Sequence, residues 1–446
     1  MKANVEDITS VKKKLIVEIE AEEIDKRIKD AYNSLAKQAK IPGFRAGKIP
    51  RKILESYYGD KLIEDLSRDL VAETLPTAVE ETKIFPISMP AIEKEALKAG
   101  CDFQFTAVLE VKPQFELKDY MGLEVEKEIF EVTDEGVDEQ LEEIRKGNGS
   151  LNSVAEDRAL QEDDYAIIDY EGFEQGKPLE DIKAENFMIK IGSNNFHPDF
   201  EKALLGLKKE DARDITVTFE EKHFHEKLAG KTVDFKVKVN DIKFLEIPEM
   251  NDEFVKNLGA DVDDVEGLKK RIKEELTSRE KKRIDQEVRT RLLRKIADKI
   301  EFELPESLIE AELKQAIENV KQNFLRSGSS LEKAGVSEQR IREDFRVASE
   351  RRVKNMLILG EIANKDDITV NEEELEEGFR ELALNMGQDP KVVRGYYEAT
   401  QAEEAFREKL LEEKTLNYIL DGATIIEVEA EKITPIESDL ASSKEA

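Results

Sequence analysis

A short cationic segment around a phenylalanine is the part of this 446-residue chain best suited to bind another molecule. Between Ala31 and Leu54 there is no acidic residue, although 101 aspartates and glutamates in the whole chain predict about five in such a window. The same window contains Lys37, Lys40, Arg45, Lys48, Arg51 and Lys52. Because the formal net charge is −31, we expect this segment to bind a negatively charged partner.

The centre of the segment, residues 41–51, reads Ile-Pro-Gly-Phe-Arg-Ala-Gly-Lys-Ile-Pro-Arg. Cationic side chains can contact phosphates, an aromatic ring can insert into an apolar site, and glycines expose the backbone. The alternative is an ordinary connection between two helices whose lysines keep it hydrated, and spacing alone does not separate the two. The candidate docking residues are Gly43, Phe44, Arg45, Ala46, Lys48 and Arg51.

The spacing of the glycines in this segment does not match a nucleotide-binding motif. From Gly43 to Ile49 it is one residue short of G-x-x-x-x-G-K-[ST], and Ile49 has no hydroxyl for magnesium. The chain has no other motif of this kind and no G-x-G-x-x-G. We therefore predict no cofactor.

Histidine and cysteine offer little for a metal or redox site. Of the three histidines, His223 and His225 would share one face of a strand, but no further ligand is evident, and exposed histidines are the alternative. We predict no metal. The single cysteine, Cys101, excludes an intrachain disulfide, and the alternating residues after it predict a half-buried strand position rather than a reactive thiol.

The bulk composition limits the partners. A net charge of −31 opposes general binding to nucleic acids or anionic membranes, so any contact with RNA must be local. The N-terminus has no apolar signal region and no stretch is apolar enough to span a bilayer. We expect a cytoplasmic protein with no membrane partner.

Periodicity predicts an α+β multidomain protein that begins with an α/β domain over residues 1–111. A strand is expected at 15–20 and a helix from Ile24 to Leu35, followed by the cationic segment. A second helix from Pro50 is expected to end at Gly59, a third to cover 60–82, and a strand to cover 102–111. The cationic segment thus joins two helices at the end of this domain.

The remaining chain divides into a linker, a β-rich domain and a helical domain. Residues 112–150, helical from Thr133, are expected to be a linker that packs with the C-terminal domain and ends in a flexible Gly-Asn-Gly-Ser joint. Residues 151–246 alternate as strands at 166–170, 187–191, 215–219 and 233–239, with a short helix at 200–205. Residues 247–432 are expected to be all-helical, with helices at 265–300, 305–324, 337–364, 371–385 and 403–418, and 433–446 a flexible tail.

The segment Gly43-Phe44-Arg45-Ala46-Gly47-Lys48-Ile49-Pro50 resembles the signature loop of the trigger factor family, which are ribosome-associated bacterial chaperones. The order of domains resembles that family over essentially the whole chain. The resemblance implies that Phe44 and Arg45 contact a large-subunit protein beside the exit tunnel and neighbouring ribosomal RNA. Ala46 replaces a lysine frequent in the family, which removes one charged contact, and Lys48 and Arg51 are candidates to compensate.

The middle domain resembles prolyl isomerases of the FK506-binding-protein (FKBP) type, so the expected architecture is a small β-rich FKBP-like domain between the α/β and helical domains. Such enzymes hold the Xaa–Pro bond in an apolar pocket that favours a twisted amide, against a barrier of about 18–20 kcal/mol. The resemblance assigns Tyr170, Phe187, Phe200 and Phe235 to the pocket, with plain core as the alternative, above all for Phe235.

The chain departs from the isomerase pattern at several positions, including Leu179, where an aromatic residue is common. His197 and Asp199 stand in the segment where Ile-Pro-Gly-Phe-Glu is usual, and His223 stands where tyrosine is usual. A polar rim should bind a proline ring less well, so the activity is expected to be weak or lost. The candidate catalytic residues are Tyr170, Phe187, His197, Phe200, His223 and Phe235.

The predicted function is an ATP-independent chaperone that docks at the ribosomal exit tunnel and shields nascent and unfolded polypeptides, with a prolyl isomerase domain whose activity is expected to be weak or lost. One alternative is a free cytosolic isomerase or holdase whose helical domain only recruits unfolded substrate. Another is a scaffold that binds an acidic protein through the cationic segment. The resemblance also implies a homodimer off the ribosome, which nothing in the residue pattern tests.

Overall fold

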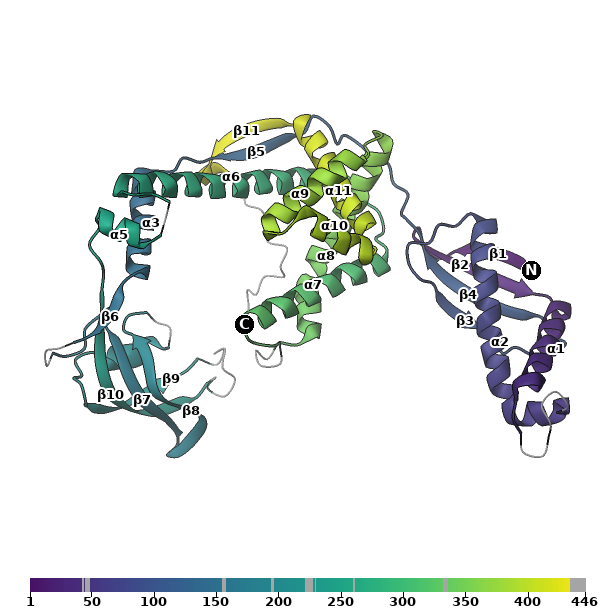
Figure 1. Cartoon of the computed structure of the whole chain (residues 1–446), viewed down its shortest axis with the longest axis horizontal. Coiled ribbons are helices and arrows are strands. Elements are labelled where there is room, and N and C mark those ends of the chain that lie inside the picture. The colour runs from purple at the N-terminus through teal and green to yellow at the C-terminus, as the bar shows by residue number, and fades with distance from the viewer. Residues whose placement is uncertain are drawn as a thin grey trace. The chain divides into compact units, whose positions relative to one another are not determined.

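The computed structural model describes residues 1–41, 44, 49–154, 158–193, 196–220, 228, 230–259, 261–331 and 336–433. These residues form two compact units. The first comprises Met1–Lys127 with Glu287–Val428, and the second is Glu128–Gln286 with Glu429–Glu431. Figure 1 shows the element order.

The first unit begins with an antiparallel sheet of four strands in the order β1-β2-β4-β3. Along β2 and β4, alternate side chains are buried, because successive residues of a strand point to opposite faces. Val17 pairs with Phe105 and Ile19 with Phe103, so these four apolar side chains lie on one face. The strands are β1 (Lys2–Asp7), β2 (Lys12–Ile19), β3 (Ala91–Lys94) and β4 (Phe103–Glu110).

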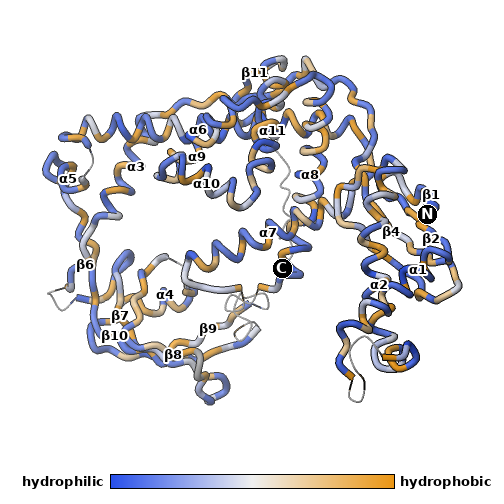
Figure 2. The backbone as a smooth tube through the Cα atoms, turned by 45° about the vertical axis from the view of Figure 1, so that its right-hand side comes forward, coloured by the Kyte–Doolittle hydropathy of each residue, from blue (hydrophilic) through white to orange (hydrophobic). Residues whose placement is uncertain are grey.

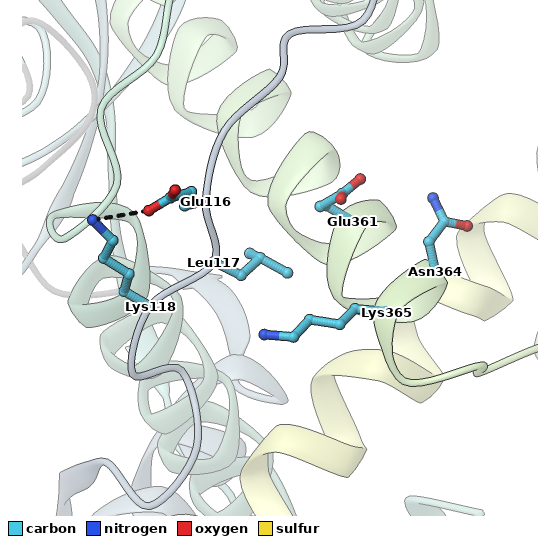
Figure 3. A pocket seen from close by; sticks show the side chains of 6 residues that line it. All are labelled: Glu116, Leu117, Lys118, Glu361, Asn364 and Lys365. Carbon is cyan, nitrogen blue, oxygen red and sulfur yellow. Dashed lines mark ion pairs between the residues drawn. The ribbon is translucent and has the colours of Figure 1, made fainter.

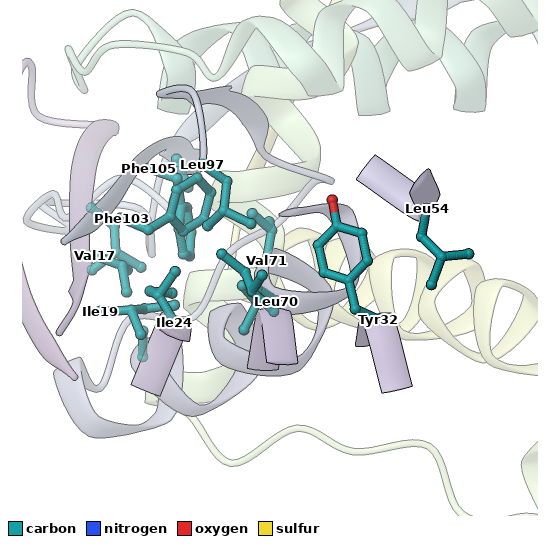
Figure 4. Close-up of a cluster of buried hydrophobic side chains, with 14 of the residues drawn as sticks. Val17, Ile19, Ile24, Tyr32, Leu54, Leu70, Val71, Leu97, Phe103 and Phe105 are labelled. Carbon is teal, nitrogen blue, oxygen red and sulfur yellow. The ribbon is translucent and has the colours of Figure 1, made fainter. Parts of the chain in front are cut away.

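Two helices, α1 (Ala21–Gln38) and α2 (Arg51–Thr82), complete the core on that face. Ile24 and Ile28 of α1 and Leu70 and Val71 of α2 belong to the same buried cluster as Phe105. Figure 4 shows the helix and strand side chains meeting in this cluster. The predicted strand at 15–20, the first helix and the strand at 102–111 are confirmed, whereas the weakly patterned β1 and β3 were not predicted.

The predicted break at Gly59 is wrong, since α2 continues through it. A glycine inside a helix costs about 1 kcal/mol relative to alanine, which packing can outweigh. A Cβ atom on Gly59 would lie 3.4 Å from the Tyr32 hydroxyl, so the tip of this α1 side chain lies against α2 at Gly59. Pro76 also lies within α2.

The prediction for Cys101 is also wrong. The residue is exposed, in a bend that precedes β4, rather than half-buried in a strand. The alternating pattern begins two residues later, at Phe103, and a strand boundary is the least certain part of a pattern-based prediction.

The second unit contains the β-rich module, a five-stranded antiparallel sheet in the order β6-β10-β7-β8, with β9 paired to β10. Its core is formed by alternate residues of β7, β9 and β10 together with Phe200 and Leu204 of α4. All four predicted strands and the short helix are confirmed. The elements are β6 (Ser150–Ser153), β7 (Tyr165–Glu174), β8 (Lys177–Lys190), α4 (Pro198–Leu204), β9 (Ala212–Thr218) and β10 (Thr232–Glu246).

The rest of the second unit is helical. Val137 of α3 (Asp134–Gly147), Val255 of α5 (Asp252–Asn257) and Leu268 of α6 (Val265–Ala297) share one buried cluster. The Thr133 side chain caps α3 by accepting the Gly136 N–H. The joint that we expected to be flexible is packed, because a Cβ on Gly149 would lie 2.7 Å from Leu245.

Helices dominate residues 287–428 of the first unit. The predicted helices are confirmed as the continuation of α6, α7 (Glu306–Arg326), α8 (Glu338–Lys365), α9 (Glu372–Met386) and α11 (Glu403–Asp421). Three elements were not predicted: α10 (Pro390–Ala399) and the paired short strands β5 (Glu124–Ile129) and β11 (Thr424–Glu429). None of the described helices is both long and apolar enough to cross a bilayer.

Buried apolar clusters hold these helices together, and two of them are small. Ile309 and Leu313 of α7 pack against Val353 and Leu357 of α8, where Phe115 stacks on Phe302 at 4.2 Å between ring centroids. The second cluster joins α9, α10 and α11 through Leu375, Phe379, Ala383, Val393 and Phe406. The predicted tail 433–446 lies outside the described residues except for residue 433.

Candidate functional site

The docking segment is fixed at both ends by buried isoleucines. Ile41 follows α1 and Ile49 precedes α2, and both belong to the core of the α/β sheet and helices. Between them, the Phe44 N–H donates to the Ile41 carbonyl at 3.1 Å, while 41% of Phe44 is exposed. The Phe44 ring is therefore partly exposed to solvent, next to the buried Ile41 and Ile49.

The start of α2 adds positive charge to this end of the domain. Its first turn contains Arg51 and Lys52 and no acidic residue, so no side chain offsets the positive end of the helix dipole. The Arg51 guanidinium lies 5.0 Å from the Tyr32 ring centroid, and its Nε donates to Glu55 at 2.7 Å. Burial and then the Glu55 charge raise the pKa of Tyr32, against the opposing charge of Arg51.

Four of the predicted docking residues, Gly43, Arg45, Ala46 and Lys48, lie outside the described residues. The structure thus brings Phe44 and Arg51 to one end of the domain and does not test the rest. Sequence reasoning missed Tyr57, which is 66% exposed two turns into α2. The signal was the Tyr57-Tyr58 pair, of which only one ring could face the core of an amphipathic helix.

In the β module, the structure brings together the predicted aromatic residues. The Tyr170 ring centroid lies 5.6 Å from Phe187, 6.4 Å from Phe200 and 6.1 Å from Phe235. Phe200 and Phe235 are fully buried, whereas Phe187 is 37% exposed. Burial raises the pKa of the Tyr170 hydroxyl. These four residues form an apolar aromatic cluster whose polar side-chain group is the Tyr170 hydroxyl.

His197 has a structural role at the edge of this cluster. It is the N-cap of α4, and its Nδ1 accepts the Asp199 N–H at 3.2 Å. This bond assigns the proton of the neutral imidazole to Nε2. The ring edge also packs against Phe219, 5.3 Å between centroids. His223 and His225 lie outside the described residues, so the roles considered for them remain predictions.

A further aromatic ring, Phe196, lies inside the cluster and was not predicted as a site residue. Its centroid is 5.5 Å from Tyr170, 4.5 Å from Phe200 and 5.8 Å from Phe235. The carboxylate of Glu201, 2% exposed, accepts the Phe196 N–H and the Ser193 hydroxyl, both at 3.3 Å. The i, i+4 spacing of two phenylalanines around a short helix was the signal that could have revealed it.

Another candidate site is a depression between residues 116–118 and the end of α8 (Figure 3). In Figure 3, Leu117 and Lys365 extend into the space between the two segments. The lining is charged, and Lys118 pairs with Glu116 at 3.1 Å, while Lys365 lies over Tyr120. This open, internally paired surface has no convergent groups that would bind a specific ligand.

Three family models match the chain. "Bacterial trigger factor protein (TF)" matches residues 1–144, and "Bacterial trigger factor protein (TF) C-terminus" matches residues 264–421. Between them, "FKBP-type peptidyl-prolyl cis-trans isomerase" matches residues 156–240, which include the aromatic cluster.

Curated relatives match over nearly the whole chain. The trigger factor of Geotalea daltonii is 36% identical over 97% of this chain and 100% of its own length. The trigger factor of Geobacter sp. strain M21 is also 36% identical, over 96% and 99% of the two chains. A solved trigger factor chaperone, from a study of promiscuous substrate recognition in folding and assembly, is 23% identical over 94% of this chain and 99% of its own, with a TM-score of 0.48.

Proposed function

This chain belongs to the trigger factor family, and on that premise we propose that it is an ATP-independent cytoplasmic chaperone that docks on the ribosome. The docking surface is the end of the α/β domain with Phe44, Arg45, Lys48 and Arg51, and its partner is a large-subunit protein with nearby RNA beside the exit tunnel. The observation that carries this proposal is the exposed Phe44 ring between two buried isoleucines, within an acid-free cationic stretch.

Charge supports a single attachment point. The chain as a whole is strongly anionic, so its mean field repels RNA, and only a local cationic surface can attract phosphates. The first turn of α2 adds its helix dipole to Arg51 and Lys52 at the same end. Phe44 then supplies an apolar anchor, the kind of side chain that typically dominates the energy of an interface.

Nascent and unfolded chains are the proposed clients of the helical region. Several large apolar side chains of this region remain exposed among charged neighbours. In Figure 2 hydrophobic and hydrophilic residues alternate along these helices. Such scattered contacts suit weak, promiscuous binding. The exposed residues are Leu325, Val347, Leu384, Met386, Val392 and Tyr396.

Prolyl isomerisation is the second proposed activity, assigned to the matched module. Its aromatic cluster offers an apolar environment that favours the twisted, less polar amide. Phe200 is fully buried, so an alanine there would also remove core packing. Phe200→Leu is therefore the better variant, and it should reduce isomerisation while leaving ribosome binding unchanged.

Co-sedimentation with vacant ribosomes tests the docking proposal. The wild type should pellet with ribosomes at low salt and less at moderate salt, and Phe44→Ala/Arg45→Ala should stay in the supernatant at both. Pelleting that the double variant does not change would reject this surface. A wild type that never pellets would reject docking itself and favour a free isomerase or holdase.

A further inference from the structure

The aromatic cluster of the β module is closed around its own Phe196. Phe196, Phe200 and Phe235 are mutually in contact, with centroid distances of 4.5, 5.8 and 5.3 Å. Tyr170 completes the group, 5.5 Å from Phe196 and 6.1 Å from Phe235. The four rings therefore form a compact tetrahedron in which each touches the other three.

These distances leave no room for a proline ring among the four side chains. Two rings in direct contact have centroids about 4.5–7 Å apart, so a third ring between them requires a separation of roughly 9 Å or more. The Tyr170–Phe200 and Tyr170–Phe235 separations are 6.4 and 6.1 Å. One of the four rings must move before a prolyl group can enter.

Burial and position in the fold together identify the ring that moves. Phe200 and Phe235 are fully buried and belong to the core of the module, so displacing either would disrupt the sheet packing. Tyr170 and Phe196 are both partly buried, but Tyr170 lies in β7 between β10 and β8, whereas Phe196 lies outside the sheet and precedes α4. Glu201 holds Phe196 through its backbone N–H, so the side chain can rotate while this hydrogen bond persists.

We propose that Phe196 is the residue that decides substrate access to the isomerase pocket: its ring fills the place of the prolyl ring, and a substrate binds by displacing it. This inference rests on the proposed isomerase activity. In the closed arrangement the Phe196 ring competes with the substrate's prolyl ring for the same place. This competition raises KM and does not lower kcat. Substrates with enough neighbouring apolar contacts displace the ring, and short peptides do so poorly.

The expected effect follows from population arithmetic. If the open arrangement is populated at about 1–10%, the apparent affinity for substrate is about 1–10% of the intrinsic affinity. Removing the Phe196 ring should then raise the apparent affinity by about 10- to 100-fold. Phe196→Ala should therefore raise kcat/KM on an Ala-Leu-Pro-Phe peptide by about tenfold or more, mainly through KM. Phe196→Leu should give a smaller gain, and Phe196→Trp should reduce the activity.

The test uses the full-length chain, with Phe244→Ala as the matched control. Phe244 is 38% exposed in β10 of the same module and outside the cluster. Thermal unfolding checks that each variant is folded, and Phe196→Leu decides the question if the alanine variant is not. NMR titration of the same peptide, read at Tyr170 and Phe235, measures binding independently of turnover.

The outcomes separate the two proposals. Wild-type turnover of the peptide decides the isomerase activity, whereas the ratio of variant to wild type decides the role of Phe196. Tighter binding and higher kcat/KM for Phe196→Ala, with Phe244→Ala unchanged, would support the displacement of this ring. A folded Phe196→Ala or Phe196→Leu that binds the peptide no better than wild type would overturn it, even if the wild type is active.

Discussion

The guanidinium of Arg51 lies over the ring of Tyr32, 5.0 Å from its centroid, and so ties the first residue of α2 to α1. The same guanidinium donates to Glu55 one turn further along α2. Because Arg51 is 54% exposed on its side chain, both contacts are in a partly hydrated setting and contribute little individually. Arg51 thus serves the fold and presents a charge at the docking end at the same time.

Arg51→Ala should lower the free energy of unfolding by about 1 kcal/mol, because an exposed cation–π contact is worth about 0.5–1 and an i, i+4 ion pair about 0.3–0.5 kcal/mol. Urea unfolding measures this loss. Glu55→Ala removes only the ion pair and should cost less. A loss above about 3 kcal/mol would mean that Arg51 supports the core rather than its edge.

Phe44→Ala should weaken ribosome docking by about 1–3 kcal/mol, since truncating a buried aromatic anchor removes its apolar contact with the partner. Binding titrations by co-sedimentation measure the change. Phe85→Ala is the matched control, because Phe85 is 82% exposed beyond the opposite end of α2. Equal effects of the two substitutions would remove Phe44 from the docking surface.

Two glycines inside helices should respond to alanine with opposite signs. At Gly59 the new Cβ would lie 3.4 Å from the Tyr32 hydroxyl, an ordinary contact, so helix propensity should stabilise the chain by about 0.5–1 kcal/mol. At Gly378 of α9 it would lie 2.8 Å from Leu410 and 3.3 Å from Phe406, which should destabilise by about 1–3 kcal/mol. Denaturant unfolding of both variants measures the difference, and a gain in stability at Gly378 would contradict it.

These glycines also illustrate how far the sequence determines the fold. Strong periodicity predicted β2, α1 and the long helices, because amphipathic patterns record which face is buried. The predicted break at Gly59 was wrong because one glycine costs only about 1 kcal/mol in a helix, and the residues of α2 on both sides of it pack in the core. The short strands β5 and β11 were missed because each has only the other as its partner, about 300 residues away in sequence.

Asp164→Asn should destabilise the β module by about 3 kcal/mol at pH 7, because it removes the carboxylate from a largely buried ion pair. Asp164 accepts from Arg158 at 2.5 and 2.8 Å and from the Gln161 N–H at 2.9 Å. Burial opposes ionisation, but these bonds prevail and lower the pKa of Asp164. Because the chain has no tryptophan, unfolding of the module in the full chain is followed by tyrosine fluorescence, which measures the loss of stability.

The pH dependence of this pair follows from the lowered pKa. The stabilisation is present above the unfolded pKa of about 3.9 and is lost as the pH falls through the lower folded value. The difference between wild type and Asp164→Asn should therefore shrink below about pH 4. If the difference in unfolding free energy between wild type and Asp164→Asn stays constant down to about pH 2, the stabilisation does not come from the charge of Asp164.

Glu412 on α11 should behave in the opposite way. Burial raises the pKa of this carboxyl, although Arg352 lies 2.8 Å away and favours ionisation. A raised folded pKa gives stability that is complete below the unfolded value of about 4.3 and is lost as the pH rises through the folded one. Glu412→Gln should thus be neutral or stabilising by up to about 1 kcal/mol at pH 7, with no advantage near pH 4.

Chemical denaturation at the two pH values measures this effect. Glu413→Gln, at the neighbouring position, controls for the lost negative charge. If Glu412→Gln costs more than about 1 kcal/mol at pH 7, the ion pair with Arg352 outweighs the burial of the carboxylate.

The candidate sites were predictable to different degrees. The proposed docking end is indicated by charge, because the absence of acids over 24 residues is visible without any structure. The closed aromatic cluster could not be predicted, since the position of Phe196 depends on the hydrogen bond from its backbone to the buried Glu201. Sequence placed both residues in the right segment but could not show that one ring fills the space between the others.

The first and last strands of the isomerase module run side by side, with Ser150 of β6 paired to Glu246 of β10. Paired residues on neighbouring strands have Cα atoms only about 4.5–5.5 Å apart, so the chain leaves the module almost where it entered. The module is therefore an insertion whose two ends are held together by the β6–β10 pair. Excision between these two positions requires only a very short bridge, and a foreign domain whose termini lie equally close could be grafted in its place.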